Sequence, residues 1–226
     1  MPKSDARLEY ILLALGTIGI AMKKNRCSLG MYHGTPQAIF KTLISTWPIE
    51  KVICNEDYEP YARDRDASIK SLLEDHQISF ETYKDQVIFE KDEIVKDDGT
   101  PYRVYTPFSR KWLHHFSENE LPYYPSETLL DKLADIEQPQ LDLTDLGFIS
   151  SKVSSPQHTF NNERITAYEA TRNFPAIDQT TRIGTPLRFG TLSVREMVRK
   201  SAAIANPTFL KELIWREFFM QILWHF

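Results

Sequence analysis

The stretch "KVICNEDYEPYARDRDASIKSLLEDHQISFETY", residues 51–83, determines the fold class of this chain. It begins with "KVICN", an apolar run typical of a strand, and it ends with a second strand-like run, "ISFETY". Between the two runs, "YEPYARDRDASIKSLLEDH" has the pattern of a charged amphipathic helix. Strands that alternate with helices over short connections indicate a parallel sheet covered by helices. We therefore predict an α/β fold of the doubly wound kind.

The residues before this unit predict a helix, a strand and another helix. "ILLALGTIGIAM", residues 11–22, has no charge but is shorter than the roughly 20 apolar residues that span a bilayer. Acidic residues stand where a signal peptide needs basic ones, so we expect a buried helix. "SLGMYHG", Ser28–Gly34, predicts a short strand. Thr35 and Pro36 are typical of a helix start, and this helix should end near Trp47, before Pro48.

The predicted sheet is incomplete at its start. A doubly wound domain normally begins with a strand, whereas this chain begins with a helix, so the first strands are expected to be missing. After residue 83, "QVIFE", residues 86–90, is interpreted as a further extended piece.

Composition indicates an ordinary globular protein. Of 226 residues, 42% are hydrophobic and 26% are charged, which excludes wholesale disorder. The net charge of −4 argues against a uniformly basic surface for nucleic acid, but the charge is unevenly distributed. Residues 1–150 carry 17 Lys and Arg against 25 Asp and Glu, whereas residues 151–226 carry 10 against 6. An anionic partner should therefore contact the C-terminal third.

The two cysteines, Cys27 and Cys54, lie far apart in the sequence and form neither a disulfide framework nor a metal-type pair. A reducing cytoplasm is the expected location. The sequence has no zinc-type ligand spacing, so we predict no metal site. Because the apolar stretch at residues 11–22 is too short to span a bilayer, we also predict no membrane partner.

Residues 117–160 contain repeated prolines and many Ser, Asp and Glu, which predicts a linker between two packed units. The expected division is an N-terminal α/β domain at 1–116, this linker, and a helical region at 161–226. In that region "ERITAYEATRNF" and "SVREMVRKSAA" predict helices, the second with a capping box at Ser193 and Glu196. Asn206 and Pro207 are interpreted as the N-cap and first residue of a final helix.

Two stripes can be read along the final helix. Leu210, Leu213, Ile214 and Phe218 predict a core side. Glu212, Trp215, Arg216 and Phe219, at i, i+3, i+4 and i+7, share another side. One hypothesis is that this second stripe carries chemistry. The alternative is a plain ion pair between Glu212 and Arg216, worth a few tenths of a kcal/mol.

Two further segments are candidates for ligand binding. The turn "QTTRIGTPLRFG", residues 179–190, places hydroxyls, glycines and two arginines ahead of a capped helix, which suits phosphate. The alternative is an interhelical loop. In "YEATRNFP", Tyr168 and Arg172 lie four apart on one helix face, and the alternative there is packing plus a solvated charge.

Four segments in one order resemble the photolyase/cryptochrome family: "NEDYEPYARDRD", "DGTPYRVYTPFSRKW", "YEATRNFP…TTRIGTPLRFGTLSVRE" and "FLKELIWREFFMQILWHF". The resemblance runs from about Ile53 to Phe226 and reaches back more loosely to Leu8. It implies an antenna-type α/β domain followed by the first helices of an all-helical FAD-binding domain. In repair members of the family, photoexcited reduced flavin gives an electron to a pyrimidine dimer flipped into a pocket.

The resemblance also implies residue roles. FAD-contacting positions are Tyr168, Thr180, Thr181, Arg182, Ile183, Gly184, Phe209, Glu212 and Arg216, with the turn residues holding the phosphates and Phe209 standing where many members have Trp. DNA or the lesion is expected at Arg172, Glu212 and Trp215. No catalytic residue is assigned within this chain.

The chain departs from the family in several places. An "RRDLRL"-like start is absent. Tyr61 and Ala62 replace the Asn-Glu pair of folate-antenna members, so folate binding is not expected and the type of any second chromophore stays open. The family's helical domain continues past Phe226, so the chain is expected to be a fragment that exposes apolar surface on its last helix and is inactive alone.

The implied activity of the parent protein is that of a deoxyribodipyrimidine photo-lyase, a carbon–carbon lyase that uses light and reduced FAD to repair pyrimidine dimers in DNA. Two alternatives are open. One is a cryptochrome-type flavin photoreceptor without repair activity, and the other is a non-catalytic remnant that binds partners.

Overall fold

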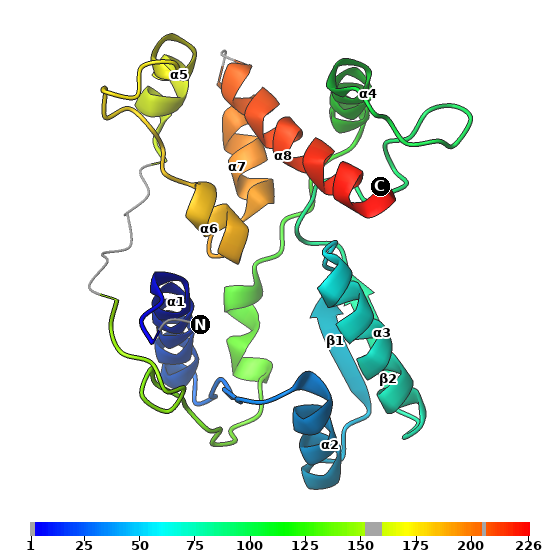
Figure 1. The fold of residues 1–226 in the computed structure, drawn as a ribbon, viewed down its shortest axis with the longest axis vertical. Coiled ribbons are helices and arrows are strands. Elements are labelled where there is room, and N and C mark those ends of the chain that lie inside the picture. Colours follow the sequence, from blue (N-terminus) through cyan, green and yellow to red (C-terminus); the bar gives the residue numbers. More distant parts are fainter. Residues whose placement is uncertain (1–2, 152–159, 205–206) are drawn as a thin grey trace. The chain divides into compact units, whose positions relative to one another are not determined.

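A computed structural model describes residues 3–151, 160–204 and 207–226. The elements follow the order α1 (Ala6–Lys24), α2 (Pro36–Thr46), β1 (Lys51–Asn55), α3 (Pro60–Glu74), β2 (Ser79–Tyr83), α4 (Tyr105–Glu118), the 3₁₀ helix η1 (Ser126–Lys132), α5 (Asn162–Thr171), α6 (Gly184–Phe189), α7 (Val194–Ala202) and α8 (Thr208–His225) (Figure 1). Two compact units form: residues 3–43 with 123–151, and residues 44–122 with 160–226. The two units are described separately below.

The predicted strand–helix–strand unit is confirmed. Strands β1 and β2 pair in parallel, with Lys51 opposite Ser79 and Asn55 opposite Tyr83. Helix α3 connects them and packs against β2, and its buried residues are Ala62, Ile69 and Leu73. The fold class is therefore an incomplete α/β sheet followed by helices, as predicted. In the described residues the sheet has these two strands.

The predicted strand at 28–34 is wrong, and the extended piece at 86–90 does not join the sheet. Residues 28–34 form no strand, because their neighbour is an irregular segment: the Met31 amide donates to the Pro139 carbonyl at 2.8 Å, and the Ser28 hydroxyl to the Ile136 carbonyl at 2.6 Å. Residues 86–90 form no strand either, although Val87, Ile88 and Phe89 are buried. Their backbone groups bond to helix side chains instead of a second strand.

The apolar helix near the N-terminus is present, but the prediction that it is buried is wrong. Helix α1 is capped by Asp5, whose side chain accepts from the Arg7 amide, and none of its residues is buried. Leu13 is 62% exposed and Ile20 is 65% exposed. Gly16, Gly19 and Ile20 of α1 line a cavity together with residues 135–138 and Gln140, so this segment does not pack closely against the helix.

Residues 117–160 were predicted to be a linker, and part of this segment packs within the first unit. Besides the contacts of Ser28 and Met31, Glu9 accepts from the Ser151 amide at 3.0 Å and from the Ser150 hydroxyl at 2.9 Å. The division at 1–116, 117–160 and 161–226 stays a prediction.

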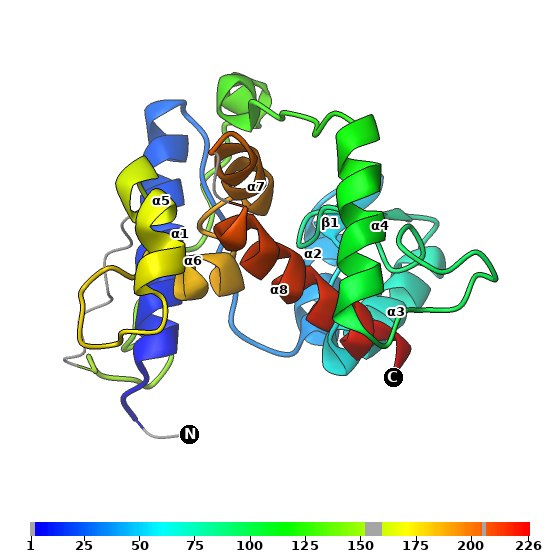
Figure 2. The same ribbon diagram turned by 90° about the horizontal axis from the view of Figure 1, so that it is seen from above.

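Helix α8 is the centre of the second unit's core. Leu210, Leu213, Ile214 and Phe218 are all buried, which confirms the predicted core stripe. Helices α4, α5 and α7 pack against α8 (Figure 2). On the opposite side Phe219, Leu223 and Phe226 are at least 40% exposed, which confirms the expected exposed apolar surface.

The helix starts follow the predicted capping only in part. The Ser193 hydroxyl accepts from the Glu196 amide at 3.4 Å and caps α7 as expected. Helix α8 begins at Thr208, so Pro207 lies just before it and not at its first position. The predicted cap residue Asn206 lies outside the described residues.

The core role of α8 can be measured by truncating one buried side chain. Ile214 is fully buried, so Ile214→Ala should lower the free energy of unfolding by about 2–5 kcal/mol through lost burial and a cavity. Urea unfolding is the measurement. Leu223→Ala, on the exposed side of the same helix, is the matched control and should cost less than about 1 kcal/mol. Equal losses in the two variants would contradict this core assignment.

Candidate flavin and lesion site

The hydroxyl-rich turn before α6 has a fixed backbone. The Arg164 guanidinium, from α5, donates to the Thr180 carbonyl at 2.6 Å. Arg182 adopts a left-handed backbone conformation with φ of 54°, and its guanidinium lies 2.8 Å from the Asp178 carboxylate. Thr181 and Ile183 are buried, whereas Thr180, Arg182 and Gly184 are exposed. Exposed and buried residues therefore alternate along the turn, and Arg164 of α5 holds its backbone in place.

Helix α6 ends at Phe189 and is followed by Gly190, which caps it. Gly190 has φ of 69°, and its amide donates to the Pro186 carbonyl. A residue with a side chain is strained in this left-handed region, so Gly190 suits the turn that leads to α7. Arg188, near the end of α6, forms an ion pair with Glu59.

Helices α5 and α8 bring the predicted lesion residues together. Arg172 lies 2.5 Å from the Glu212 carboxylate, and its guanidinium also lies over the Tyr168 ring, 5.5 Å from the centroid. Tyr168 meets Phe209 edge to face, with centroids 5.1 Å apart. Burial and, to a smaller extent, the Glu212 charge raise the pKa of Tyr168. Two residues expected to contact DNA are thus paired with each other in this structure.

The alternative in which Glu212 pairs with Arg216 is wrong. Glu212 bonds to Arg172, whereas Arg216 donates to the carbonyls of Gln86, at 2.7 Å, and Leu187, at 3.4 Å. Burial lowers the pKa of Arg216. The predicted stripe of α8 therefore splits: Glu212 pairs with Arg172 at the end of α5, Trp215 stacks on Tyr105 of α4, and Arg216 binds backbone carbonyls.

Trp215 lies in an aromatic cluster that includes α4. Its indole stacks on the Tyr105 ring, with centroids 3.7 Å apart and planes inclined by 7°. Phe218 and Phe219 lie within 5.7 Å of the same indole, measured between centroids. Trp215 itself is half-buried, so part of the indole stays accessible.

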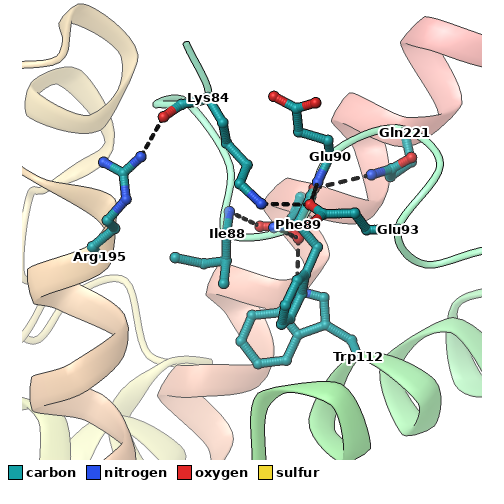
Figure 3. Close-up of polar contacts among 9 residues, drawn as sticks. Lys84, Ile88, Phe89, Glu90, Glu93, Trp112, Arg195 and Gln221 are labelled. Carbon is teal, nitrogen blue, oxygen red and sulfur yellow. Dashed lines mark hydrogen bonds and ion pairs between the residues drawn. The ribbon is translucent and has the colours of Figure 1, made fainter. Parts of the chain in front are cut away.

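Sequence reasoning missed Glu217, which is 2% exposed. Its carboxylate accepts from the Ile88 amide at 2.6 Å, the Phe89 amide at 3.0 Å and the Trp112 indole N–H at 2.7 Å. Ile88, Phe89 and Trp112 converge around this point in Figure 3. Burial raises the pKa of Glu217 to about 7, and the three N–H groups oppose that shift. Its spacing from Leu213 and Ile214 puts it on the apolar stripe, a signal that could have identified it.

Glu217 is one of several side chains that bind a single segment. We call residues 84–91, which follow β2, the strap. Side chains of α7 and α8 bond its backbone throughout: Arg195 at the Lys84 carbonyl, Arg216 at the Gln86 carbonyl, Glu217 at the Ile88 and Phe89 amides, Gln221 at the Phe89 carbonyl and His225 at the Lys91 carbonyl. The strap thus fixes the end of the parallel sheet to the helices within this unit.

A cavity of about 380 Å³ opens beside the strap, at the carboxyl ends of the two strands. Asn55 and Asp85 line it from the sheet side, and the Asn55 amide donates to the Asp85 carboxylate at 3.0 Å. Arg188 and Arg216 line it from the helices. In open α/β sheets such strand ends are where ligands bind.

Comparison with known proteins identifies the family of this chain. The family model for DNA photolyase matches residues 1–126. The chain belongs to the DNA photolyase family. A deoxyribodipyrimidine photo-lyase from Alkalihalophilus pseudofirmus is 28% identical over 89% of this chain and 46% of its own length. The chain spans about half the length of the curated photolyases it matches.

Solved photolyase structures share the fold. A bacterial class III photolyase from Agrobacterium tumefaciens superposes with a TM-score of 0.76 at 24% identity, over the whole chain and 51% of that protein. An archaeal photolyase from Sulfolobus tokodaii, solved with two FAD molecules, gives a TM-score of 0.71 at 20% identity, over 98% of this chain and 49% of that protein.

Membrane-spanning helices and metal-binding clusters are both absent from residues 3–151, 160–204 and 207–226. No helix within them is long and apolar enough to cross a membrane. The same residues contain no group of three or more His, Cys, Asp or Glu side chains that could hold a metal ion.

The raised pKa of Glu217 makes a prediction about pH. Its folded value of about 7 exceeds the ordinary 4.5, so between these pH values the folded state holds a proton that the unfolded state has lost. Its contribution to stability is therefore full below pH 4.5 and is lost as pH rises through 7. Glu217→Gln cannot titrate at this position. Relative to that variant, the free energy of unfolding of the unsubstituted protein should fall by roughly 1–3 kcal/mol between pH 4.5 and 8.

Urea unfolding at several pH values measures this difference. Glu74→Gln, an exposed change on α3, is the control and should leave the pH profile as it is. Profiles that run parallel for the unsubstituted protein and Glu217→Gln would contradict the assignment.

Proposed function

We propose that the protein is a light-dependent DNA repair enzyme, a deoxyribodipyrimidine photo-lyase that acts on pyrimidine dimers with reduced FAD. The observations that carry this proposal are the ion pair of Arg172 and Glu212 beside Tyr168 and Phe209, and the half-buried Trp215, which follows Glu212 on the same helix α8. These residues offer a cation for phosphate, an acceptor for base N–H groups and an aromatic face for an unstacked base. The activity is proposed for the whole protein, since the curated photolyases are about twice as long as this chain.

The donor set of the turn fits the phosphates of FAD. Thr180 and Gly184 are exposed and offer a hydroxyl and backbone N–H groups, and exposed Arg182 adds a cation that also pairs with Asp178, whereas Thr181 is buried. Tyr168 and Phe209 would contact the cofactor alongside them. Reduced FAD, when bound and photoexcited, supplies the electron that opens the cyclobutane ring of the dimer.

The residues of this chain would bind and orient the lesion. Arg172 would contact a phosphate, and Glu212 would accept a hydrogen bond from a base edge. Because these two residues form an ion pair, DNA binding must exchange that pair for contacts with phosphate and base. Both side chains are about one-third exposed, so the exchange requires little rearrangement of the core. The net charge of +4 over residues 151–226 attracts the same ligand.

The cavity beside the strap is the proposed place for a second, light-harvesting chromophore. Its volume of about 380 Å³ lies within the range of small-molecule pockets, and Arg216 lines it. Folate is not the proposed chromophore, since Tyr61 and Ala62 stand at the positions where folate-antenna members have Asn and Glu.

Substitution of the lesion residues tests the proposal. Trp215→Ala should weaken binding of an oligonucleotide that contains one thymine dimer by about tenfold or more, because base–aromatic stacking contributes roughly 1–3 kcal/mol. Glu212→Gln should weaken it too, through loss of a charged acceptor. Fluorescence anisotropy in the dark would measure affinity, on FAD-loaded protein expressed from its whole reading frame.

Trp47→Ala and Glu74→Gln are matched controls, and undamaged oligonucleotide is the reference ligand. Unchanged dimer affinity after both Trp215→Ala and Glu212→Gln would refute the assigned lesion site. Protein that holds FAD but has no preference for the dimer would instead support the photoreceptor alternative.

A further inference from the structure

Tyr105, the first residue of α4, is attached to α8 in two ways. Its ring lies parallel to the Trp215 indole at a centroid distance of 3.7 Å. Its hydroxyl donates to the Lys211 carbonyl at 2.9 Å, one turn before Trp215. Burial and then the Glu212 charge raise the pKa of Tyr105 to about 12, so the phenol keeps its proton and stays a donor at neutral pH.

The ring of Tyr105 has little freedom to move. It meets Phe218 edge to face at 5.9 Å between centroids, and it begins a helix whose next turns bury Phe108 and Trp112. A ring held at both its face and its hydroxyl fixes the side chain stacked on it. The indole of Trp215 is therefore restricted in orientation: Tyr105 stacks on it at 3.7 Å, Phe219 lies nearly parallel to it at 5.5 Å between centroids, and the residue remains half-buried.

We propose that Tyr105 is a positioning residue for lesion recognition: it stacks behind Trp215 and holds the indole ready for the flipped base. This inference rests on the proposed function, which assigns Trp215 to the lesion. A free indole on a helix must lose rotamer freedom when a base stacks on it. Tyr105 removes that freedom before DNA arrives, and such preorganisation raises affinity.

Substitutions at position 105 separate the ring from the hydroxyl. Tyr105→Leu removes the stack, and Tyr105→Phe keeps the stack but loses the bond to Lys211. We expect Tyr105→Leu to weaken binding of the dimer oligonucleotide about 2- to 10-fold, the range for aromatic pairs, and Tyr105→Phe to stay within about 2-fold of the unsubstituted protein. Tyr102→Leu is the matched control, since Tyr102 packs edge to face on Phe108 of the same helix.

A double-mutant cycle distinguishes positioning from general support of the fold. If Tyr105 acts through the indole, Tyr105→Leu should have no further effect on dimer affinity in the Trp215→Ala background. An equal loss in both backgrounds would overturn the inference, because it would mean that Tyr105 only supports α4.

A readout without DNA keeps the two proposals distinguishable. The near-ultraviolet circular dichroism of the stacked indole should change in the same way in Tyr105→Leu and in Trp215→Phe, and little in Tyr105→Phe. A spectrum unaffected by Tyr105→Leu would overturn the positioning role. Changed spectra with dimer affinity unaffected by Trp215→Ala would show that the stack exists and that the lesion assignment fails.

Discussion

A buried carboxylate, Glu217, satisfies the backbone of a segment that has no strand to pair with. Val87, Ile88 and Phe89 are buried without a ladder, and an unpaired N–H group costs roughly 1–3 kcal/mol there. Glu217 accepts from two of these amides, and from the Trp112 indole. The strap can therefore lie in the core without unpaired amides at Ile88 and Phe89. Because it follows β2 and is bonded to α8, it also holds the end of the sheet against the helices of this unit.

Helix α8 serves two purposes because its sides differ. One side, with Glu217 and Gln221, binds the strap. The other carries Glu212 and Trp215 toward the proposed lesion site. Helix α4 contacts both sides, with Trp112 at Glu217 and Tyr105 at Trp215. Helices α4 and α8 thus hold both the strap and the candidate lesion site, so a change in the packing of these two helices should affect the strap and the site together.

Local patterns in the sequence were sufficient for part of this structure. The parallel βαβ unit, the Ser193 cap and the core stripe of α8 each depend on neighbouring residues and were predicted. The strand at 28–34 was not found, because a strand needs a partner and the segment beside it is irregular. The partners of Arg216 and Glu217 lie about 130 residues away, and no local pattern could pair them. The family resemblance suggested roles for Tyr168, Arg172 and Glu212, and the structure adds that Arg172 and Glu212 form an ion pair.

The most direct test of this account is amide hydrogen exchange at Ile88 and Phe89. Both amides lie outside any helix or strand, yet the account predicts that they exchange as slowly as the buried amides of α8. Exchange at the rate of exposed loop amides would contradict it, because the strap would then not be held by Glu217.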